Sequence, residues 1–237
     1  MKGALNYLAE LLYPPRCAMC GELMSPGKQR RCFCERCLGI WENEKQASCP
    51  QCRMPVNRCR CQPKYNKSRV ADSFCSLTLY DTENIKRLIH TFKTVSDPAL
   101  TETAARDLTA AVFSKIRIDR SCILAYPGRS REAISRCGFD HAELLCKKIG
   151  KYTGIPVFKG IKHRRAQQQK TLSASERGYN ALRSYYISEK YKSELKGRHV
   201  IFIDDVVTTG ATAVICAALC KAAGAVNVSV FSLARTP

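Results

Sequence analysis

The chain has 237 residues, of which 45% are hydrophobic and 25% charged; this suits a globular domain plus a smaller unit and excludes a largely disordered chain. Its 39 Lys and Arg residues against 20 Asp and Glu give a formal net charge of +19, far from the near-balance of most cytosolic enzymes. Such a surface favours a polyanionic partner: a phosphorylated substrate, nucleic acid or an anionic membrane. A basic surface that only keeps the protein in solution is the simplest alternative.

The first residues, "MKGALNYLAELLYPPRC", contain a short apolar stretch that Glu10, Pro14 and Pro15 interrupt. No small-residue cleavage pattern follows, and no segment approaches 18 consecutive apolar residues, so we expect neither a signal peptide nor a membrane-inserted helix. This predicts a cytoplasmic protein. In that reducing compartment the 15 cysteines are expected to be thiols or metal ligands rather than disulfides.

Nine cysteines precede residue 62, and eight of them form four closely spaced pairs. Two residues between thiolates let both sulfurs of one turn reach one ion, and two such turns complete a tetrahedral shell. The pattern predicts one or two Zn²⁺ ions, held by Cys17, Cys20, Cys34, Cys37, Cys49, Cys52, Cys59 and Cys61.

The spacing leaves the details of these metal sites open. Cys59 and Cys61 are one residue closer together than is usual, and Cys32 could replace Cys34. Sequential and interleaved pairing of the four turns both fit. Because such sites usually fold a mini-domain too small to build its own core, we interpret the zinc as structural.

The polar and basic stretch 62–70 is interpreted as a linker between a zinc-binding domain at 1–61 and a second domain at 71–237. In the second domain the hydrophobic periodicity predicts alternating strands and helices. The expected elements are a strand reaching Tyr80, a helix burying Ile85, Leu88, Ile89 and Phe92, a helix from Pro98 to Ile116, a strand over 122–127, a helix that begins with an Asp140 and Glu143 capping box and stops near Gly150, and a strand from Ile155 to Phe158.

The last segment has the clearest pattern. A strand from Val200 to Ile203, a helix over 213–224 that ends at Gly224, and a strand over 226–234 make a βαβ unit. This alternation predicts an α/β fold with a mostly parallel sheet that binds ligands at the carboxyl ends of its strands.

The sequence "DDVVTTGAT" follows the first strand of that unit. A loop rich in Gly, Thr and Ala that leads into a helix offers free backbone N–H groups and the positive helix end to a phosphate. It is neither a Walker A loop nor a dinucleotide fingerprint, because it lacks their Gly and Lys patterns. The two carboxylates need donating partners such as sugar hydroxyls, or a metal ion. A phosphorylated ribose meets both requirements, and a receiver-type metal site is the alternative.

The motif "VIFIDDVVTTGAT" closely resembles the 5-phosphoribosyl 1-diphosphate (PRPP) binding motif of type I phosphoribosyltransferases. The resemblance implies a catalytic acidic pair, Asp204 and Asp205, that holds the ribose 2′- and 3′-hydroxyls, while Thr208 to Thr212 wrap the 5-phosphate. The implied PRPP-binding stretch is Asp204, Asp205, Val206, Val207, Thr208, Thr209, Gly210, Ala211 and Thr212.

In this enzyme class a nucleophile attacks C1 of PRPP through an oxocarbenium-like transition state while pyrophosphate leaves with Mg²⁺. Arg129 and Arg131 follow the strand that ends at Pro127, and they are our candidates for the pyrophosphate side. The alternative for each is a solvated loop arginine.

The whole chain resembles the ComF (ComFC) competence family, which joins an N-terminal cysteine-rich zinc module to a phosphoribosyltransferase-like domain. The matching stretches are "YPPRCAMCG", "IKRLIHTFK", "GFDHAELL" and "QKTLSASERGYN". The sequence departs from the family pattern at "AYPGR" and at Cys137, which bears on the pyrophosphate loop. The fold implies a flexible hood over the site within 159–198. There Gln169, Lys170, Arg177 and Asn180 match the family pattern and either order the hood, contact the acceptor or serve as scaffold.

The sequence does not identify a general base or an acceptor, and three functions fit it. They are a phosphoribosyltransferase of nucleotide metabolism with an unknown acceptor, a PRPP-binding competence factor that handles incoming single-stranded DNA with the DNA-uptake machinery, and a PRPP-responsive binding module without turnover. DNA would contact basic residues and stacking aromatics. The candidate path, unless these residues only form a solvated face, is Arg30, Arg31, Lys64, Lys67, Arg69, Lys162, Arg164 and Arg165.

Overall fold

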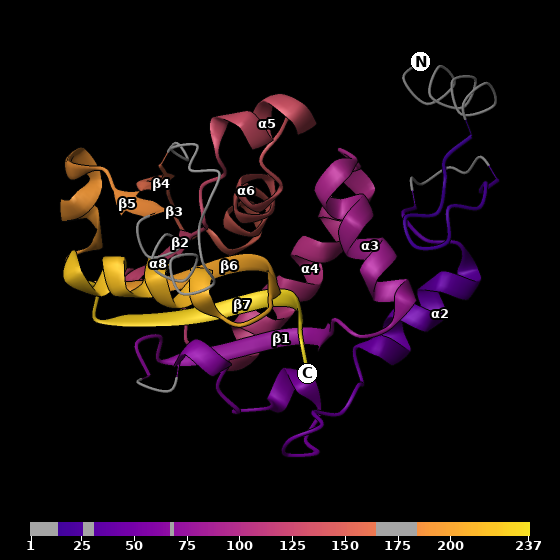
Figure 1. Ribbon diagram of the computed structural model, residues 1–237, viewed down its shortest axis with the longest axis horizontal. Coiled ribbons are helices and arrows are strands. Elements are labelled where there is room, and N and C mark those ends of the chain that lie inside the picture. The colour runs from indigo at the N-terminus through magenta and orange to yellow at the C-terminus, as the bar shows by residue number, and fades with distance from the viewer. Residues whose placement is uncertain (1–13, 26–30, 67–68, 165–183) are drawn as a thin grey trace, which may run out of the picture.

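A five-stranded sheet forms the centre of the computed structural model, which describes residues 14–25, 31–66, 69–164 and 184–237 (Figure 1). Every neighbouring pair of its strands is parallel, so the predicted α/β fold with a mostly parallel sheet is confirmed. In spatial order the strands are β1 (Ser73–Leu79), β7 (Asn227–Arg235), β6 (His199–Val207), β2 (Cys122–Ala125) and β3 (Val157–Phe158).

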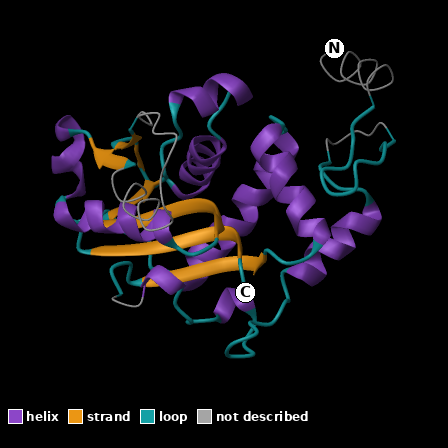
Figure 2. Ribbon diagram, viewed as in Figure 1, coloured by secondary structure: helices purple, strands orange, loops and turns teal. Residues whose placement is uncertain are grey.

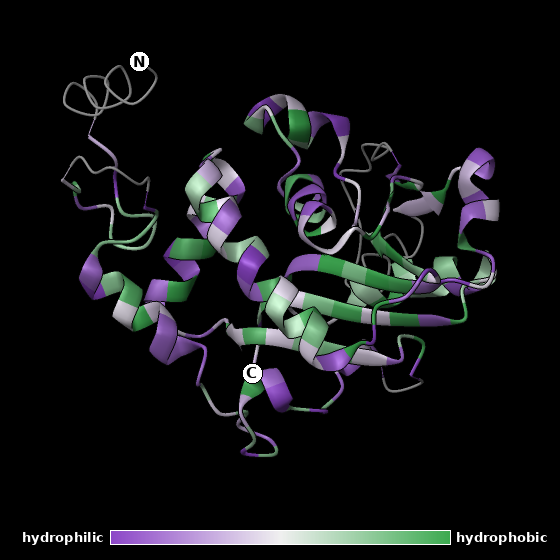
Figure 3. Ribbon diagram, turned by 180° about the vertical axis from the view of Figure 1, so that it is seen from behind, coloured by the Kyte–Doolittle hydropathy of each residue, from purple (hydrophilic) through white to green (hydrophobic). Residues whose placement is uncertain are grey.

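Helices cover both faces of this sheet, because successive side chains of a strand point to opposite faces and each face is apolar (Figure 2). Along β6, Ile201 and Ile203 pack with α3, α4 and α6, while Val200 and Phe202 pack with α8 on the other face. Figure 3 shows the hydrophobic ribbon concentrated in these central strands. The covering helices are α3 (Glu83–Thr94), α4 (Pro98–Lys115), α6 (His141–Thr153) and α8 (Ala211–Ala222).

The helix starts follow the capping signals of the sequence. Asp97 caps α4 ahead of Pro98, and Asp140 caps α6 by accepting hydrogen bonds from the backbone N–H groups of Ala142 and Glu143. The reciprocal half of the expected capping box is absent from the described contacts, since the Glu143 carboxylate pairs with Lys147 at 2.8 Å instead.

Several predicted boundaries were wrong; the helix expected over 213–224 is α8 at Ala211–Ala222, and the strand expected from Ile155 begins at Val157. Helix α6 continues through Gly150 and ends before Gly154, whose φ is +73°. A Cβ at Gly150 would lie 3.0 Å from the Ile155 carbonyl oxygen, so a larger residue there would require its neighbours to shift by a few tenths of an ångström. Strand β6 runs on to Val207, since residues up to there pair with β7, so the acidic pair lies within the strand rather than after it. The 122–127 strand stops at Ala125, and α5 (Arg131–Cys137) was not expected.

The cysteine-rich module contains α2 (Glu35–Glu44) and the short helix η1 (Val56–Arg58), and it packs directly onto α4 and β1. Trp41 is buried and its Nε1 donates to Asp107 Oδ2 on α4 at 2.7 Å, while the Thr78 hydroxyl of β1 donates to the Glu44 carbonyl oxygen at 2.7 Å. Because the buried residues of both regions form one continuous cluster, the domain limits 1–61, 62–70 and 71–237 stay a prediction.

The remaining elements lie at the other end of the molecule or in the predicted linker. The antiparallel pair β4 (Ile161–His163) and β5 (Tyr185–Ile187) precedes η3 (Glu189–Leu195), and η2 (Lys64–Asn66) follows the last zinc-ligand candidate. The hood candidates Gln169, Lys170, Arg177 and Asn180 lie outside the described residues. Among the described helices, none is both long and apolar enough to cross a bilayer.

Candidate functional site

A cavity of about 380 Å³ opens at the carboxyl ends of β2 and β6, within the size range of small-ligand sites. It is the position that a parallel sheet offers to a ligand. Its walls come from the β1–α3 loop, α3, the β2–α5 loop, the start of α6, β5 and the β6–α8 segment. The lining residues are Tyr80, Lys93, Pro127, Gly128, Arg129, His141, Ala142, Tyr185, Asp204, Asp205, Val206, Thr208 and Thr212.

Asp205 is held by two basic side chains. Lys93 Nζ lies 3.1 Å from Asp205 Oδ1, and His141 Nε2 contacts Asp205 Oδ2. Burial, at 5% exposed, opposes ionisation of Asp205, but the hydrogen bond from His141 and the charge of Lys93 outweigh it and lower the pKa. Asp205 is therefore an anion fixed by the protein itself.

Asp204 has the opposite electrostatic environment. Its carboxylate accepts a hydrogen bond from the Asp205 backbone N–H at 2.9 Å and forms no ion pair with a described residue. Burial and the neighbouring Asp205 charge raise its pKa to about 8. Consecutive strand residues usually face opposite ways, yet both carboxyls line one cavity because it lies at the end of the sheet. Carboxylate oxygens suit Mg²⁺, and Asp204 is the member of the pair that would exchange its proton for a ligand's cation.

The loop after β6 leads directly into α8. Gly210 precedes the helix with φ +83° and offers no side-chain cap, while the Thr209 hydroxyl accepts from the Ala211 N–H at 3.4 Å. The first N–H groups of a helix have no partner within it, and its N-terminus carries partial positive charge, so this end suits an anion. Thr208 and Thr212 line the cavity there, whereas Val207 and Thr209 line a neighbouring cavity of about 270 Å³.

The two arginine candidates occupy different places. Arg129 lines the cavity, and its backbone N–H donates to Asp140 Oδ2 at 3.1 Å, so the residue that caps α6 also holds the β2–α5 loop. Arg131 is the first residue of α5 rather than a loop residue, and it lines neither cavity. Gly210 and Ala211 also line neither.

Sequence reasoning missed Lys93, His141 and Tyr185 as members of this site. Lys93 lies in the last turn of α3, within the stretch "IKRLIHTFK", and His141 directly follows the helix-capping Asp140. Both residues belong to stretches that carry the family resemblance, but only the packing of α3 and α6 on the sheet brings their side chains to the acidic pair.

The eight cysteines form two groups in sequential order, Cys17, Cys20, Cys34 and Cys37, then Cys49, Cys52, Cys59 and Cys61. Within each group the ligand atoms all lie within 4.8 Å of one another; Cys20 and Cys34 sulfurs are 3.9 Å apart, and Cys52 and Cys59 sulfurs 3.4 Å. A tetrahedral Zn²⁺ with bonds of 2.3 Å requires about 3.8 Å between sulfurs, so both groups fit the ion.

Cys32 is not a member of either group. Its Sγ lies 3.2 Å from the Thr103 hydroxyl, and burial raises its pKa to about 11, which keeps it a thiol. All 15 cysteines are free of disulfides. In the second group the Arg235 guanidinium donates to Cys59 Sγ at 3.1 Å.

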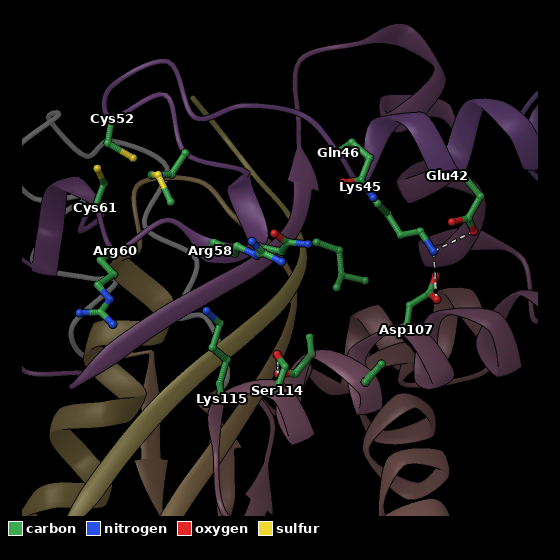
Figure 4. A pocket seen from close by; sticks show the side chains of 15 residues that line it. Glu42, Lys45, Gln46, Cys52, Arg58, Arg60, Cys61, Asp107, Ser114 and Lys115 are labelled. Atoms are coloured by element: carbon green, nitrogen blue, oxygen red, sulfur yellow. Dashed lines mark hydrogen bonds and ion pairs between the residues drawn. The ribbon is translucent and has the colours of Figure 1, made fainter.

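Another cavity, of about 1090 Å³, lies between the second cysteine group, α2 and α4 (Figure 4). Lys45 at one end is paired with Glu42 and Asp107. At the other end lie Arg58 and Arg60 of the cysteine-rich module and Lys115 at the end of α4, and none of them forms an ion pair with a described residue (Figure 4).

No family model matches the chain. It is 32% identical over 104 residues to competence protein F of Haemophilus influenzae, covering 42% of this chain and 44% of that protein. It is 28% identical over 203 residues to the DNA utilization protein YhgH of Salmonella typhi, covering 81% and 86%. Competence protein ComFC of Bacillus subtilis is 27% identical over 197 residues, covering 79% and 78%. The chain thus matches less than half the length of the first of these relatives.

Similar solved structures include a glutamine PRPP amidotransferase from B. subtilis (16% identity, TM-score 0.41, 61% of this chain and 30% of that chain). Another is adenine phosphoribosyltransferase from Leishmania tarentolae (15% identity, TM-score 0.38, 62% and 74%). The named sequence relatives confirm the resemblance to the ComF proteins.

Proposed function

We propose that this chain, a relative of the ComF competence proteins, is a cytoplasmic PRPP-binding protein that takes part in handling single-stranded DNA during DNA uptake. The observation that carries the proposal is the single cavity at the carboxyl ends of β2 and β6. It combines the acidic pair, the hydroxyl-rich start of α8 and the Arg129 loop.

In the proposed complex the two acids have distinct tasks. Asp204, which lacks a cationic partner, accepts from a ribose hydroxyl, and Asp205 completes that contact while Lys93 and His141 fix its orientation. The hydroxyls of Thr208 and Thr212, with the N–H groups between them, hold the 5-phosphate.

The pyrophosphate half of the ligand would extend toward Arg129, with Arg131 at the start of α5 as a more distant cation. Bound Mg²⁺, held by the ligand's phosphate oxygens and the acidic pair, would neutralise the charge of the leaving group. Turnover requires an acceptor; His141 is a poor candidate for its base, because its Nε2 is already committed to Asp205. Each cysteine group would hold one structural Zn²⁺.

Basic residues that alternate with exposed aromatics support the DNA part of the proposal. Arg164 lies over the ring of Tyr186, 5.2 Å from its centroid, and Lys162 is on the neighbouring strand. Tyr65 is 53% exposed next to Lys64, and its backbone N–H donates to the Thr209 carbonyl oxygen. Both places adjoin the β6–α8 site, and stacking beside cations is how proteins bind single strands without sequence preference.

The other proposed contacts extend this surface. The unpaired cations of Figure 4, Arg58, Arg60 and Lys115, form a second basic area next to the cysteine module. Arg31 and Arg69 of the candidate path are described, whereas Arg30, Lys67 and Arg165 lie outside the described residues.

Thermal unfolding with Mg²⁺ and PRPP tests the site. A ligand that binds only the folded state adds about 2.7 kcal/mol to the free energy of unfolding when its concentration is 100 times its Kd, and the melting temperature rises as a result. We expect a shift for the wild-type chain and none for the folded Asp204→Asn, Asp205→Asn double variant. An equal shift in both would assign PRPP to another site, and no shift in the wild type would refute PRPP binding. Release of pyrophosphate when candidate bases are offered would show that the chain also turns PRPP over, in addition to binding it.

A further inference from the structure

The end of β7 lies between the second cysteine group and the phosphate loop 207–210. We propose that Arg235 and Thr236 are positioning residues that make PRPP affinity depend on the second metal site but not on the first. This inference rests on the proposed function, because it concerns the same phosphate loop.

Arg235 is fixed by its backbone and directed at the metal site by its side chain. Its backbone pairs with Val207 of β6 and Leu79 of β1, so two strands hold it. Its Nη2 donates to Cys59 Sγ at 3.1 Å, and it forms no ion pair with a described carboxylate. The Cys59 sulfur is therefore the described side-chain partner of the guanidinium, which is placed as outer groups are that orient and stabilise metal ligands.

Thr236, the next residue, is bonded to the phosphate loop. Its backbone N–H donates to the Val207 carbonyl oxygen at 3.0 Å, and its hydroxyl donates to the Thr208 carbonyl oxygen at 3.0 Å. Two consecutive residues thus connect a metal ligand to the segment that would carry the 5-phosphate.

The chain leaving the second cysteine group makes a second connection. Pro63 lies against Gly210, where an added Cβ would be 2.7 Å from the Pro63 Cβ, and the Tyr65 N–H donates to the Thr209 carbonyl oxygen at 3.1 Å. Between the two connections lies the cavity of about 270 Å³, whose lining includes Cys49, Cys61, Thr208, Thr209, Arg235 and Thr236.

Metal occupancy changes what these connections can hold. A Zn²⁺ ion in the second group would tie its four cysteines together, and so would fix the Cys59 sulfur to which Arg235 donates; without the ion these four side chains share no ligand. The segment 49–61 then loses the ion that holds its turns together, and the hydrogen bonds to the carbonyl oxygens of the phosphate loop, which orient that loop, weaken. The first cysteine group has no described contact with this loop and packs on α4 instead.

Paired cysteine variants test the difference between the two metal sites. Cys52→Ser with Cys61→Ser removes half of the second group, and Cys20→Ser with Cys34→Ser removes the corresponding half of the first. In calorimetric titrations of PRPP with Mg²⁺, with zinc content measured by mass spectrometry, we expect the second-group variant to lose about tenfold in affinity. The first-group variant should stay within about twofold of wild type while losing one zinc. Equal affinities in the two variants would overturn the inference.

Substitutions at the strand end test the residues themselves. The Arg235→Met variant should lose zinc to a chelator faster than wild type and bind PRPP more weakly. In the Arg235→Lys variant, zinc retention and PRPP affinity should both be partly restored. Arg36→Met is the matched control, because Arg36 lies beside the first group and pairs with Glu22 at 3.1 Å. It should leave PRPP affinity unchanged.

Thr236→Val leaves both cysteine groups intact, so it tests the positioning role even if the cysteine variants do not fold. It removes only the hydroxyl donor to Thr208, so PRPP affinity should fall severalfold with zinc content unchanged; unchanged affinity contradicts the positioning role. A wild-type chain that does not bind PRPP would overturn the proposed function and this inference together. Wild-type binding that needs Asp204 but ignores Arg235, Thr236 and the second metal would overturn the inference alone.

Discussion

In the cysteine-rich module each set of four ligands comes from one short stretch of chain, 17–37 or 49–61. The cavity at the carboxyl ends of β2 and β6 instead takes its polar side chains from six separate segments, including Lys93 of α3 and His141 of α6. The first kind of site is encoded by local spacing, and the second exists only when the sheet and its helices are packed. Metal binding should therefore survive changes that destroy the cavity, whereas ligand binding in the cavity requires the whole fold.

The largest expected effect follows from removing ligands of the first cysteine group. Cys17→Ser with Cys37→Ser should abolish one zinc and lower the free energy of unfolding by several kcal/mol, because a structural zinc supplies about 10 kcal/mol or more in small modules. Zinc content and thermal unfolding measure the change. Cys137→Ser, outside both groups, is the control and should stay within about 0.5 kcal/mol of wild type. Wild-type stability in the double variant would mean that the first group is not a metal site.

The contact between the two regions gives the next effect. Trp41→Ala removes a buried ring and its hydrogen bond to Asp107, which should cost about 3 kcal/mol in denaturant unfolding. Trp41→Phe retains most of the ring and should cost about 1 kcal/mol. If the two regions unfold independently, neither substitution will change the unfolding of the α/β part.

A smaller effect depends on pH through Asp204. Its pKa in the folded protein, about 8, lies above the value near 3.9 of an unfolded chain, so between these pH values the folded protein binds the extra proton. Stability from this group therefore falls as pH rises from about 4 to about 8. The Asp204→Asn variant has no ionisable group at this position, so its free energy of unfolding should exceed that of wild type by on the order of 2 kcal/mol at pH 8. The difference stays this small because Asp204 is partly exposed and solvent screens its charge. Parallel stability curves for the two proteins would contradict this environment for Asp204.

The smallest expected change concerns the basic surface. Lys162→Ala with Arg164→Ala should reduce the salt dependence of single-stranded oligonucleotide binding by about one to two units of slope. Lys151→Ala, on α6 and outside the proposed path, is the control. No binding at low salt by the wild-type chain would remove DNA from the proposed function.

Much of the fold follows from local patterns in the sequence. The run from Val200 to Ile203, the capping residue Asp140 and the face of Ile85, Leu88, Ile89 and Phe92 all identify elements that the structure contains. The boundaries failed where tertiary contacts decide them: strand pairing with β7 carries β6 past the acidic pair, and close packing against Ile155 suits Gly150 to the interior of α6.

The candidate site was only partly predictable for the same reason. Thr208, Thr212 and the acidic pair are adjacent in sequence, so one motif identifies them. Lys93 and His141 lie far from that motif in the chain, and their charges matter only because α3 and α6 cover the same face of the sheet.

The central claim is that one cavity holds a phosphorylated ribose through its hydroxyls and its 5-phosphate. Competition against bound PRPP tests it most directly, using ribose 5-phosphate, ribose and pyrophosphate on the zinc-loaded wild-type chain and on Asp204→Asn, Asp205→Asn. We expect ribose 5-phosphate to displace PRPP from the wild type far better than ribose, and the double variant to bind neither phosphorylated sugar. Displacement by pyrophosphate alone, with ribose 5-phosphate inert and the double variant still binding PRPP, would contradict the claim.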